Sequence, residues 1–174
     1  MRAIVTGALQ ATAEDLAALE ALGLTVTVHP DERAAVENPE QYEIALCNNL
    51  FGFHDLDAFP NLKYIQLTAA GMDRVPLERI LQKGIELKNA AGVYSIPMAE
   101  FALCGVLQLY KQSRFFAENQ AQHGWNKHRN LLELWGKQVT VVGCGNIGQE
   151  CAKRFAAFGC RMVGVDIFEG TVPH

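Results

Sequence analysis

The sequence predicts an α/β protein in which parallel strands alternate with helices. From the first residues onward, short runs rich in β-branched side chains take turns with segments of helical periodicity. This alternation is typical of a parallel sheet with helices on its faces. Near the end, the run VVGCGNIG (residues 141–148) joins a predicted strand to a predicted helix through three glycines. Hydrophobic residues make up 49% of the 174 positions, which is enough for a real core.

The first 91 residues contain five predicted strands, enough for a small doubly wound domain. The first helix has Thr12 as its N-cap, two acidic residues in its first turn, and Gly23 at its end. In the third helix, Pro76 stands where a helix start tolerates proline. The strands are expected over residues 2–7, 24–29, 42–48, 63–71 and 85–90. The helices are expected over residues 12–23, within 54–62, where Pro60 ends the helix, and over residues 75–84.

A long helix is predicted next, beginning at Pro97 and ending at Gln122. Its first half is mostly apolar on several sides, so it must be covered on several sides. It therefore lies between two domains or packs against a second copy of the chain. The loop that follows is polar, and its small basic cluster at residues 127–129 is interpreted as a solvated face.

The glycine-rich run has the arrangement of a dinucleotide site. A β-branched strand over residues 138–142 leads into Gly143, a helix follows, and a second strand ends in Asp166, about 20 residues further on. Gly143 makes the tight turn and Gly145 lets a pyrophosphate approach the backbone. Gly148 allows the helix to pack closely on the strand. The alternative is a glycine turn that serves packing only.

The remaining predicted cofactor contacts come from the helix start and from the acidic residue. The amides around Asn146 and Ile147 are unpaired at the helix N-terminus and point at the phosphate. The Asp166 carboxylate is expected to accept hydrogen bonds from the adenosine ribose hydroxyls. No arginine follows it, because Ile167 and Phe168 come next. A 2′-phosphate would meet an uncompensated carboxylate, so NAD is favoured over NADP. The apolar face of the helix is expected to hold Ile147, Cys151, Phe155 and Phe158.

A second candidate site follows the fourth strand. The run QLTAAGMDRV places small residues at 69–71 just after a strand end, where backbone N–H groups are accessible to a carboxylate. Ligands of open α/β sheets bind beyond the carboxyl ends of the strands. The alternative is an ordinary turn from a strand to a helix.

Charge and cysteine usage narrow the classes of partner. A formal net charge of −4 argues against a nucleic-acid partner. The five cysteines form no CxxC pair, so they are interpreted as reduced, buried residues of a cytoplasmic protein. A reactive thiol at Cys144 is the alternative. The N-terminal residues are not expected to be a signal peptide, and the apolar run over residues 99–110 is too short to span a membrane. No metal site is predicted.

With these stretches assembled, the chain resembles the D-isomer-specific 2-hydroxyacid dehydrogenases over essentially its whole length. The resemblance rests on AAGMDRV, on NAAGVYSIPMAEFAL, on Trp125 in the loop, and on ELWGKQVTVVGCGNIGQECAKRFAAFGCRMVGVD. Met98 stands where the family usually has valine, and Phe101 where histidine is frequent. Neither of these positions carries chemistry.

The resemblance implies a flavodoxin-like substrate domain over residues 1–96, followed by the first part of an NAD-binding Rossmann domain over residues 97–174. It implies reversible hydride transfer between NAD and a 2-hydroxy or 2-keto acid. Ala70 and Gly71 match the loop that holds the substrate carboxylate in this family. The long helix and its following loop match the elements through which the family forms homodimers.

The family's catalytic arginine, acidic residue and histidine come after the second Rossmann strand, and no residue here matches them. The histidines all lie outside a matching motif: His29, His54, His123, His128 and His174. No catalytic residue is therefore assigned, and the chain is expected to be a dehydrogenase truncated after its first βαβ unit. Two alternatives stay open: a chain encoded short by a degenerate gene, and a non-catalytic NAD-binding or oligomerisation module.

Overall fold

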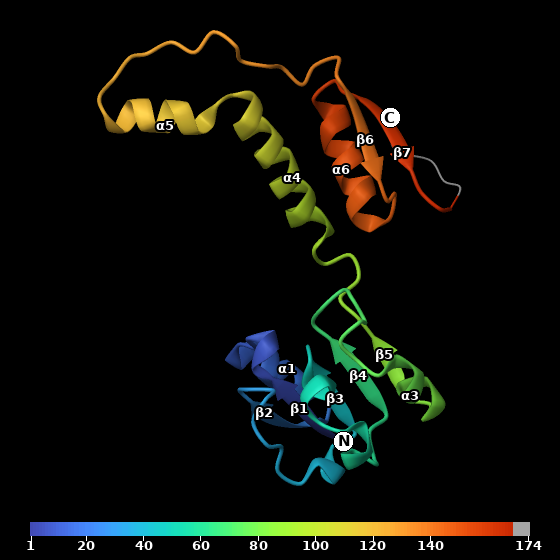
Figure 1. The fold of residues 1–174 in the computed structure, drawn as a ribbon. Helices are drawn as coiled ribbons and strands as arrows, with labels where there is room; N and C mark the ends of the chain where they lie inside the picture. The colour runs from blue at the N-terminus through green and yellow to red at the C-terminus, as the bar shows by residue number, and fades with distance from the viewer. Residues whose placement is uncertain (169–174) are drawn as a thin grey trace. The chain divides into compact units, whose positions relative to one another are not determined.

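The computed structural model describes residues 1–168, so His174 lies outside the described residues. The chain divides into two compact units, one over residues 1–91 and the other from Gly92 onward (Figure 1). Each unit is an α/β structure with its own parallel sheet. The predicted fold class, a flavodoxin-like domain followed by the first part of a Rossmann domain, is confirmed.

The first unit is built on a five-stranded parallel sheet in the order β2-β1-β3-β4-β5. This is the flavodoxin-like order, in which the chain winds outward from β1 in both directions. All five predicted strands are present. They are β1 (Arg2–Thr6), β2 (Thr25–His29), β3 (Ile44–Cys47), β4 (Tyr64–Leu67) and β5 (Glu86–Lys88).

The helices of this unit agree with the prediction at two places and differ at two others. Both α1 (Ala13–Ala21) and α3 (Leu77–Gln82) form as expected. The helix predicted over residues 54–62 is wrong, because only the 3₁₀ turn η3 (Leu56–Ala58) forms there. Pro60 disfavours helical backbone in the residue before it, which stops the turn from extending. The short helix α2 (Leu50–Phe53) and the 3₁₀ turns η1 (Gly7–Leu9) and η2 (Pro39–Gln41) were not predicted.

The core of the first unit lies between the sheet and these helices. Ile4, Ala45 and Ile65 come from three neighbouring strands and are fully buried. Phe51 and Phe59 pack edge to face with ring centroids 5.5 Å apart, an arrangement that aromatic quadrupoles favour. The core thus packs on the central strands of the sheet, and the loops at the carboxyl ends of the strands lie outside it, where they can form binding sites.

The single helix predicted from Pro97 to Gln122 is instead two helices, α4 (Ser95–Tyr110) and α5 (Ser113–Ala121). The break falls at Gln112, whose backbone is left-handed with φ 52°. The returning loop supports the break, because the Leu132 amide donates to the Tyr110 carbonyl at 3.0 Å. The Lys111 ammonium in turn donates to the Leu132 carbonyl at 2.7 Å. A carbonyl left over at the end of α4 is therefore satisfied by the loop.

The rest of the second unit is a strand–helix–strand unit, formed by β6 (Gln138–Val142), α6 (Asn146–Ala157) and β7 (Arg161–Val165). The two strands are parallel and paired in register. α6 packs on the strands and also against α4, where Arg154 and Glu100 form an ion pair at 3.3 Å. Of the predicted apolar face of α6, only Phe155 is buried. The other buried residues of the helix, Gly148 and Ala152, lie outside that predicted face.

The shift of that face has a steric cause. The helix turns its glycine toward β6, so the neighbouring Ile147 stays 39% exposed, and Phe158 at the far end is 44% exposed. On the two-stranded sheet, side chains at alternate positions remain open to solvent, with Val142 82% exposed. Within residues 1–168, one face of this sheet is therefore uncovered.

The interpretation of the cysteines as uniformly buried is wrong. Only Cys47 is buried, Cys104 is exposed, and Cys144, Cys151 and Cys160 are half-buried free thiols. Burial raises the pKa of the Cys47 thiol to about 12. Among the described residues, no helix is long and apolar enough to cross a membrane. The same part of the chain holds no group of three side chains suited to a metal ion.

Candidate cofactor and substrate sites

The glycine turn after β6 is shaped by Gly143. Its backbone has φ +91°, a conformation that side-chain-bearing residues rarely adopt. Its amide donates to the Val165 carbonyl at 2.8 Å, which ties the turn to the end of β7. The chain is then redirected into α6 at Asn146. The predicted tight turn therefore has its physical basis in one positive φ and one bond between the strand ends.

The other two glycines differ in what a side chain would meet. A Cβ on Gly148 would overlap the Gly143 carbonyl oxygen and lie 3.1 Å from Cγ1 of Val141. The helix thus approaches the strand more closely than any side chain would allow. A Cβ on Gly145 would meet no atom within 4 Å. Gly145 therefore borders open space at the helix start.

The first turn of α6 presents backbone donors toward that space. The first intrahelical bond that spans a full turn runs from the Gln149 amide to the Gly145 carbonyl at 2.9 Å. The amides of Asn146, Ile147 and Gly148 come before it and have no partner within the helix. The helix has twelve residues, so its dipole adds a partial positive charge at this end. Such an end binds anions.

Asp166 lies directly beside the glycine turn. Its Oδ2 accepts a hydrogen bond from the Cys144 amide at 2.5 Å, and its Oδ1 accepts one from the Phe168 amide at 3.2 Å. These two bonds lower the pKa of the Asp166 carboxyl below its ordinary value, and the bond from the Cys144 amide has the larger effect. The carboxylate is solvent-exposed and ionised at neutral pH. The structure thus brings together the predicted residues of this site: Gly143, Gly145, Asn146, Ile147, Gly148 and Asp166.

These residues fit a dinucleotide. An anion would meet backbone amides and no side chain at Gly145, and a hydroxyl donor would meet an ionised carboxylate at Asp166. Ile167 and Phe168 are 90% and 77% exposed. In the sequence, these two residues indicated only the absence of an arginine. Their exposure adds an apolar surface next to the carboxylate.

The second predicted site lies in the first unit, just after β4. Ala70 and Gly71 are exposed at the carboxyl edge of the parallel sheet. The turn is tied to its neighbours on both sides. The Thr68 amide donates to the Cys47 carbonyl at 2.9 Å, and the Ala90 amide donates to the Ala69 carbonyl at 3.0 Å. The turn is therefore part of the sheet edge.

A further polar cluster at the same sheet edge is centred on Glu32. Its carboxylate accepts hydrogen bonds from the Asn48 and Asn49 amides at 2.6 and 2.7 Å. The buried hydroxyl of Thr6 also donates to it, at 2.7 Å. The His54 ring forms a 2.8 Å hydrogen bond with the Glu32 carbonyl. The carboxylate thus joins the ends of β1 and β3. Sequence reasoning missed Glu32, because it lies in a loop without a motif.

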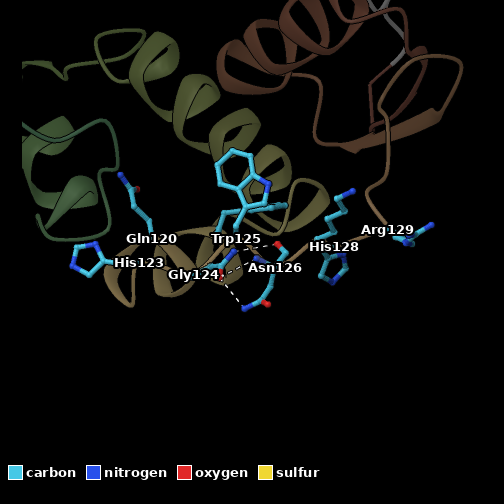
Figure 2. Close-up of a pocket in the computed structure, with 10 residues that line it drawn as sticks. Gln120, His123, Gly124, Trp125, Asn126, His128 and Arg129 are labelled. Atoms are coloured by element: carbon cyan, nitrogen blue, oxygen red, sulfur yellow. Dashed lines mark hydrogen bonds between the residues drawn. The ribbon is translucent and has the colours of Figure 1, made fainter.

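The end of α5 and the loop after it curl around a cavity of about 910 Å³ (Figure 2). Trp125 stands beside it and is 92% exposed. Asn119 closes the loop, because its side chain bonds with both the backbone and the side chain of Asn126. The cluster interpreted as a solvated basic face, Lys127, His128 and Arg129, lines this cavity. The His128 ring also packs edge to face on Phe115, with centroids 5.1 Å apart.

Comparison with known proteins places these features in context. The family model described as D-isomer specific 2-hydroxyacid dehydrogenase, NAD binding domain, matches residues 103–172. The hydroxypyruvate reductase of Thermotoga maritima is 32% identical over 112 residues, which cover 64% of this chain and 37% of that protein. The D-3-phosphoglycerate dehydrogenase of Methanocaldococcus jannaschii is 33% identical over 106 residues, which cover 60% of this chain and 20% of that protein.

Solved structures share the fold over nearly the whole chain. The D-lactate dehydrogenase of Aquifex aeolicus, solved with NAD and lactic acid, has a TM-score of 0.80 at 23% identity. The match covers 97% of this chain and 52% of that one. A protein of Thermus thermophilus has a TM-score of 0.73 at 26% identity, with 100% of this chain and 58% of that one covered. The chain spans 20% to 58% of the length of these four proteins.

Proposed function

Because the chain belongs to the D-isomer specific 2-hydroxyacid dehydrogenase family, we propose that it forms part of an NAD-dependent oxidoreductase of 2-hydroxy and 2-keto acids. The observation that carries the proposal is the contact between the glycine turn and Asp166. It sets backbone donors for a pyrophosphate beside a carboxylate for a ribose. When bound, the cofactor would supply hydride chemistry. Its oxidised form would accept a hydride from the hydroxyl-bearing carbon of a 2-hydroxy acid, and its reduced form would donate one to the keto carbon of a 2-keto acid.

The second unit holds the cofactor. The amides of Asn146 and Ile147 bind the pyrophosphate, and Gly145 leaves room for it to reach the backbone. The Asp166 carboxylate accepts hydrogen bonds from the ribose hydroxyls. It also disfavours a 2′-phosphate, because two negative charges would meet next to the apolar Ile167 and Phe168. This site therefore selects NAD over NADP.

The first unit, which we assign as the substrate domain, holds the substrate carboxylate at Ala70 and Gly71. The peptide bonds of the described residues are trans, so the N–H of each peptide points opposite to its C=O. The Ala69 and Ala70 carbonyls are both bound on one side of the turn, by Ala90 and Asn89. The amides of Ala70 and Gly71 therefore face the other side, as a pair of donors for an anion.

The sequence holds no motif that matches the family's catalytic arginine, acidic residue and histidine. We therefore propose that the 174 residues alone bind NAD but turn over no 2-keto acid. The alternative is a non-catalytic NAD-binding or oligomerisation module. Its support is the open face of the β6–β7 sheet and the exposed apolar side chains of α4. A coupled assay of NADH consumption with a panel of 2-keto acids tests the proposal, and turnover by the chain alone would contradict it.

Exposed apolar side chains on α4 and in the loop after α5 also support a homodimer formed through α4, α5 and that loop. Phe101, Leu109 and Trp125 are each more than 70% exposed, and α4 is covered by α6 on only part of its surface. Large apolar side chains left exposed are typical of interaction sites. Sedimentation equilibrium should give a dimer, and Trp125→Ala should weaken it. A monomer at micromolar concentration would refute this assembly. The cytoplasmic location, supported by five free thiols, stays a prediction.

A further inference from the structure

The turn at residues 69–71 is held by one side chain besides its backbone bonds. Asn89 follows β5, the strand next to β4, and its Nδ2 donates to the Ala70 carbonyl at 2.7 Å. The next residue, Ala90, donates its amide to the Ala69 carbonyl at 3.0 Å. Two successive carbonyls of the turn are thus fixed from the same neighbouring segment. The orientation of the following two amides depends on these two bonds.

The orientation of the Asn89 side chain is itself fixed. Its Oδ1 accepts a hydrogen bond from the Ala91 amide at 3.3 Å, so its Nδ2 is the atom that faces the Ala70 carbonyl. A carboxamide offers a donor on one branch and an acceptor on the other, and this site uses both. An aspartate here would place an oxygen against the carbonyl oxygen and reverse the interaction.

The two amides that the turn presents are free to bind a ligand. Within residues 1–168, neither the Ala70 amide nor the Gly71 amide donates a hydrogen bond to a backbone carbonyl. Both residues are exposed. Without the Asn89 bond, the peptide that carries the Gly71 amide is held by neither of its polar groups, and it can rotate away from a shared target. A donor pair held in place before binding loses less freedom when the anion arrives.

We propose that Asn89 is a positioning residue, which sets the affinity for the substrate carboxylate by holding the Ala70 carbonyl. This inference rests on the proposed function, in which Ala70 and Gly71 bind that carboxylate. Asn89 contacts the turn through its peptide group, so its effect acts on binding and on the order of the turn.

The test uses ¹⁵N-labelled chain and oxamate as a probe, since oxamate carries a carboxylate next to a carbonyl group. In the unchanged protein, oxamate should shift the amide resonances of Ala70 and Gly71. Asn89→Ala should weaken oxamate binding roughly three- to tenfold, the effect of one lost hydrogen bond. Asn89→Asp should weaken it further. Asn61→Ala is the matched control, because Asn61 Nδ2 also donates to a backbone carbonyl, that of Glu40, at 2.7 Å. It should bind oxamate like the unchanged chain.

A second readout does not depend on the probe. The heteronuclear NOE of the Ala70 and Gly71 amides should fall in Asn89→Ala and stay unchanged in Asn61→Ala. Unchanged NOE values together with unchanged oxamate affinity in Asn89→Ala would overturn the positioning role and leave the carboxylate site standing. If oxamate shifts neither amide in the unchanged chain, the carboxylate site itself fails, and the role of Asn89 in binding fails with it.

Discussion

The three glycines of the turn after β6 have three different physical tasks, which the sequence pattern alone treats alike. Gly143 supplies a positive φ, Gly148 supplies close contact, and Gly145 supplies access. The difference lies in what surrounds each Cα, and it separates the effects of substitution on folding from the effects on binding.

The pair Gly148→Ala and Gly145→Ala should separate these roles. At Gly148 the added methyl group overlaps the Gly143 carbonyl, so the free energy of unfolding should fall by about 1–3 kcal/mol. At Gly145 the methyl group enters open space, with φ −69° suited to alanine, so stability should change little while NAD affinity falls about tenfold or more. Urea unfolding and NAD titration of both variants measure this. Equal losses of stability would contradict the assignment.

The pH dependence of cofactor binding follows from the Asp166 carboxyl. Its pKa is lowered in the folded chain by the Cys144 and Phe168 amides. The carboxylate of the folded chain is therefore fully ionised well above the ordinary aspartate pKa of about 3.9, and it becomes protonated only as the pH falls through a value below that. NAD affinity should be constant from pH 8 to about pH 5 and fall only below about pH 4. A midpoint near pH 6 would point to a histidine and count against Asp166.

Glu32 provides a residue-scale prediction about stability. In Glu32→Ala, the buried Thr6 hydroxyl and the Asn48 and Asn49 amides lose their acceptor. Polar groups left without a partner should cost about 1–3 kcal/mol of unfolding free energy. Glu37→Ala, in the same loop but exposed, is the control and should change stability by less than about 0.5 kcal/mol. Similar midpoints in thermal unfolding for both variants would refute the role of Glu32.

The residues of the glycine turn could be predicted because their tasks are local. A tight turn, a helix start and a strand end lie within 24 residues of one another, and each leaves a sequence signature. Glu32 could not be predicted, because its partners, two backbone amides and the Thr6 hydroxyl, are brought near one another by the pairing of β1 with β3. Two of these three donors are backbone groups that require no particular residue, and the third lies 26 positions away, so no local pattern marks the carboxylate.

At the scale of elements, α1 is fixed by a reciprocal cap. The Thr12 hydroxyl accepts from the Asp15 amide at 3.2 Å, and Asp15 Oδ2 accepts from the Thr12 amide at 2.8 Å. The sequence indicated Thr12 as the cap and placed Asp15 in the first turn. The structure adds that the two residues cap each other, as in a capping box.

Thr12→Ala should lower the free energy of unfolding by about 1 kcal/mol. The double variant with Thr12→Ala and Asp15→Ala should lose less free energy of unfolding than the sum of the losses of the two single variants, because each residue depends on the other. Chemical denaturation of the two single variants and the double variant measures the coupling. Full additivity would show that the box does not act as a unit.

The helix break at Gln112 and the short η3 turn mark the limit of prediction at this scale. Periodicity continues through residues 111–113, so the pattern alone favours one long helix. The break depends on a returning loop that bonds to Tyr110 and Lys111 from about 20 residues away. Strand positions were predictable, because β-branched runs between turn residues have few alternatives.

At the scale of the whole molecule, the two units have complementary tasks in the proposed function. The first offers amides for a carboxylate, and the second offers amides for a pyrophosphate and a carboxylate for a ribose. Within the described residues, the β6–β7 sheet keeps one face and its strand edges open. Such edges favour association, so oligomeric state and cofactor binding should be measured on the same sample.

The most direct test of the central claim is calorimetric titration of the chain with NAD and with NADP, repeated on Asp166→Ala. The unchanged chain should bind NAD more tightly than NADP. Asp166→Ala should weaken NAD binding and narrow the difference between the two cofactors. Equal binding of both cofactors by the unchanged chain, or NAD binding unaffected by Asp166→Ala, would contradict the selection of NAD by Asp166.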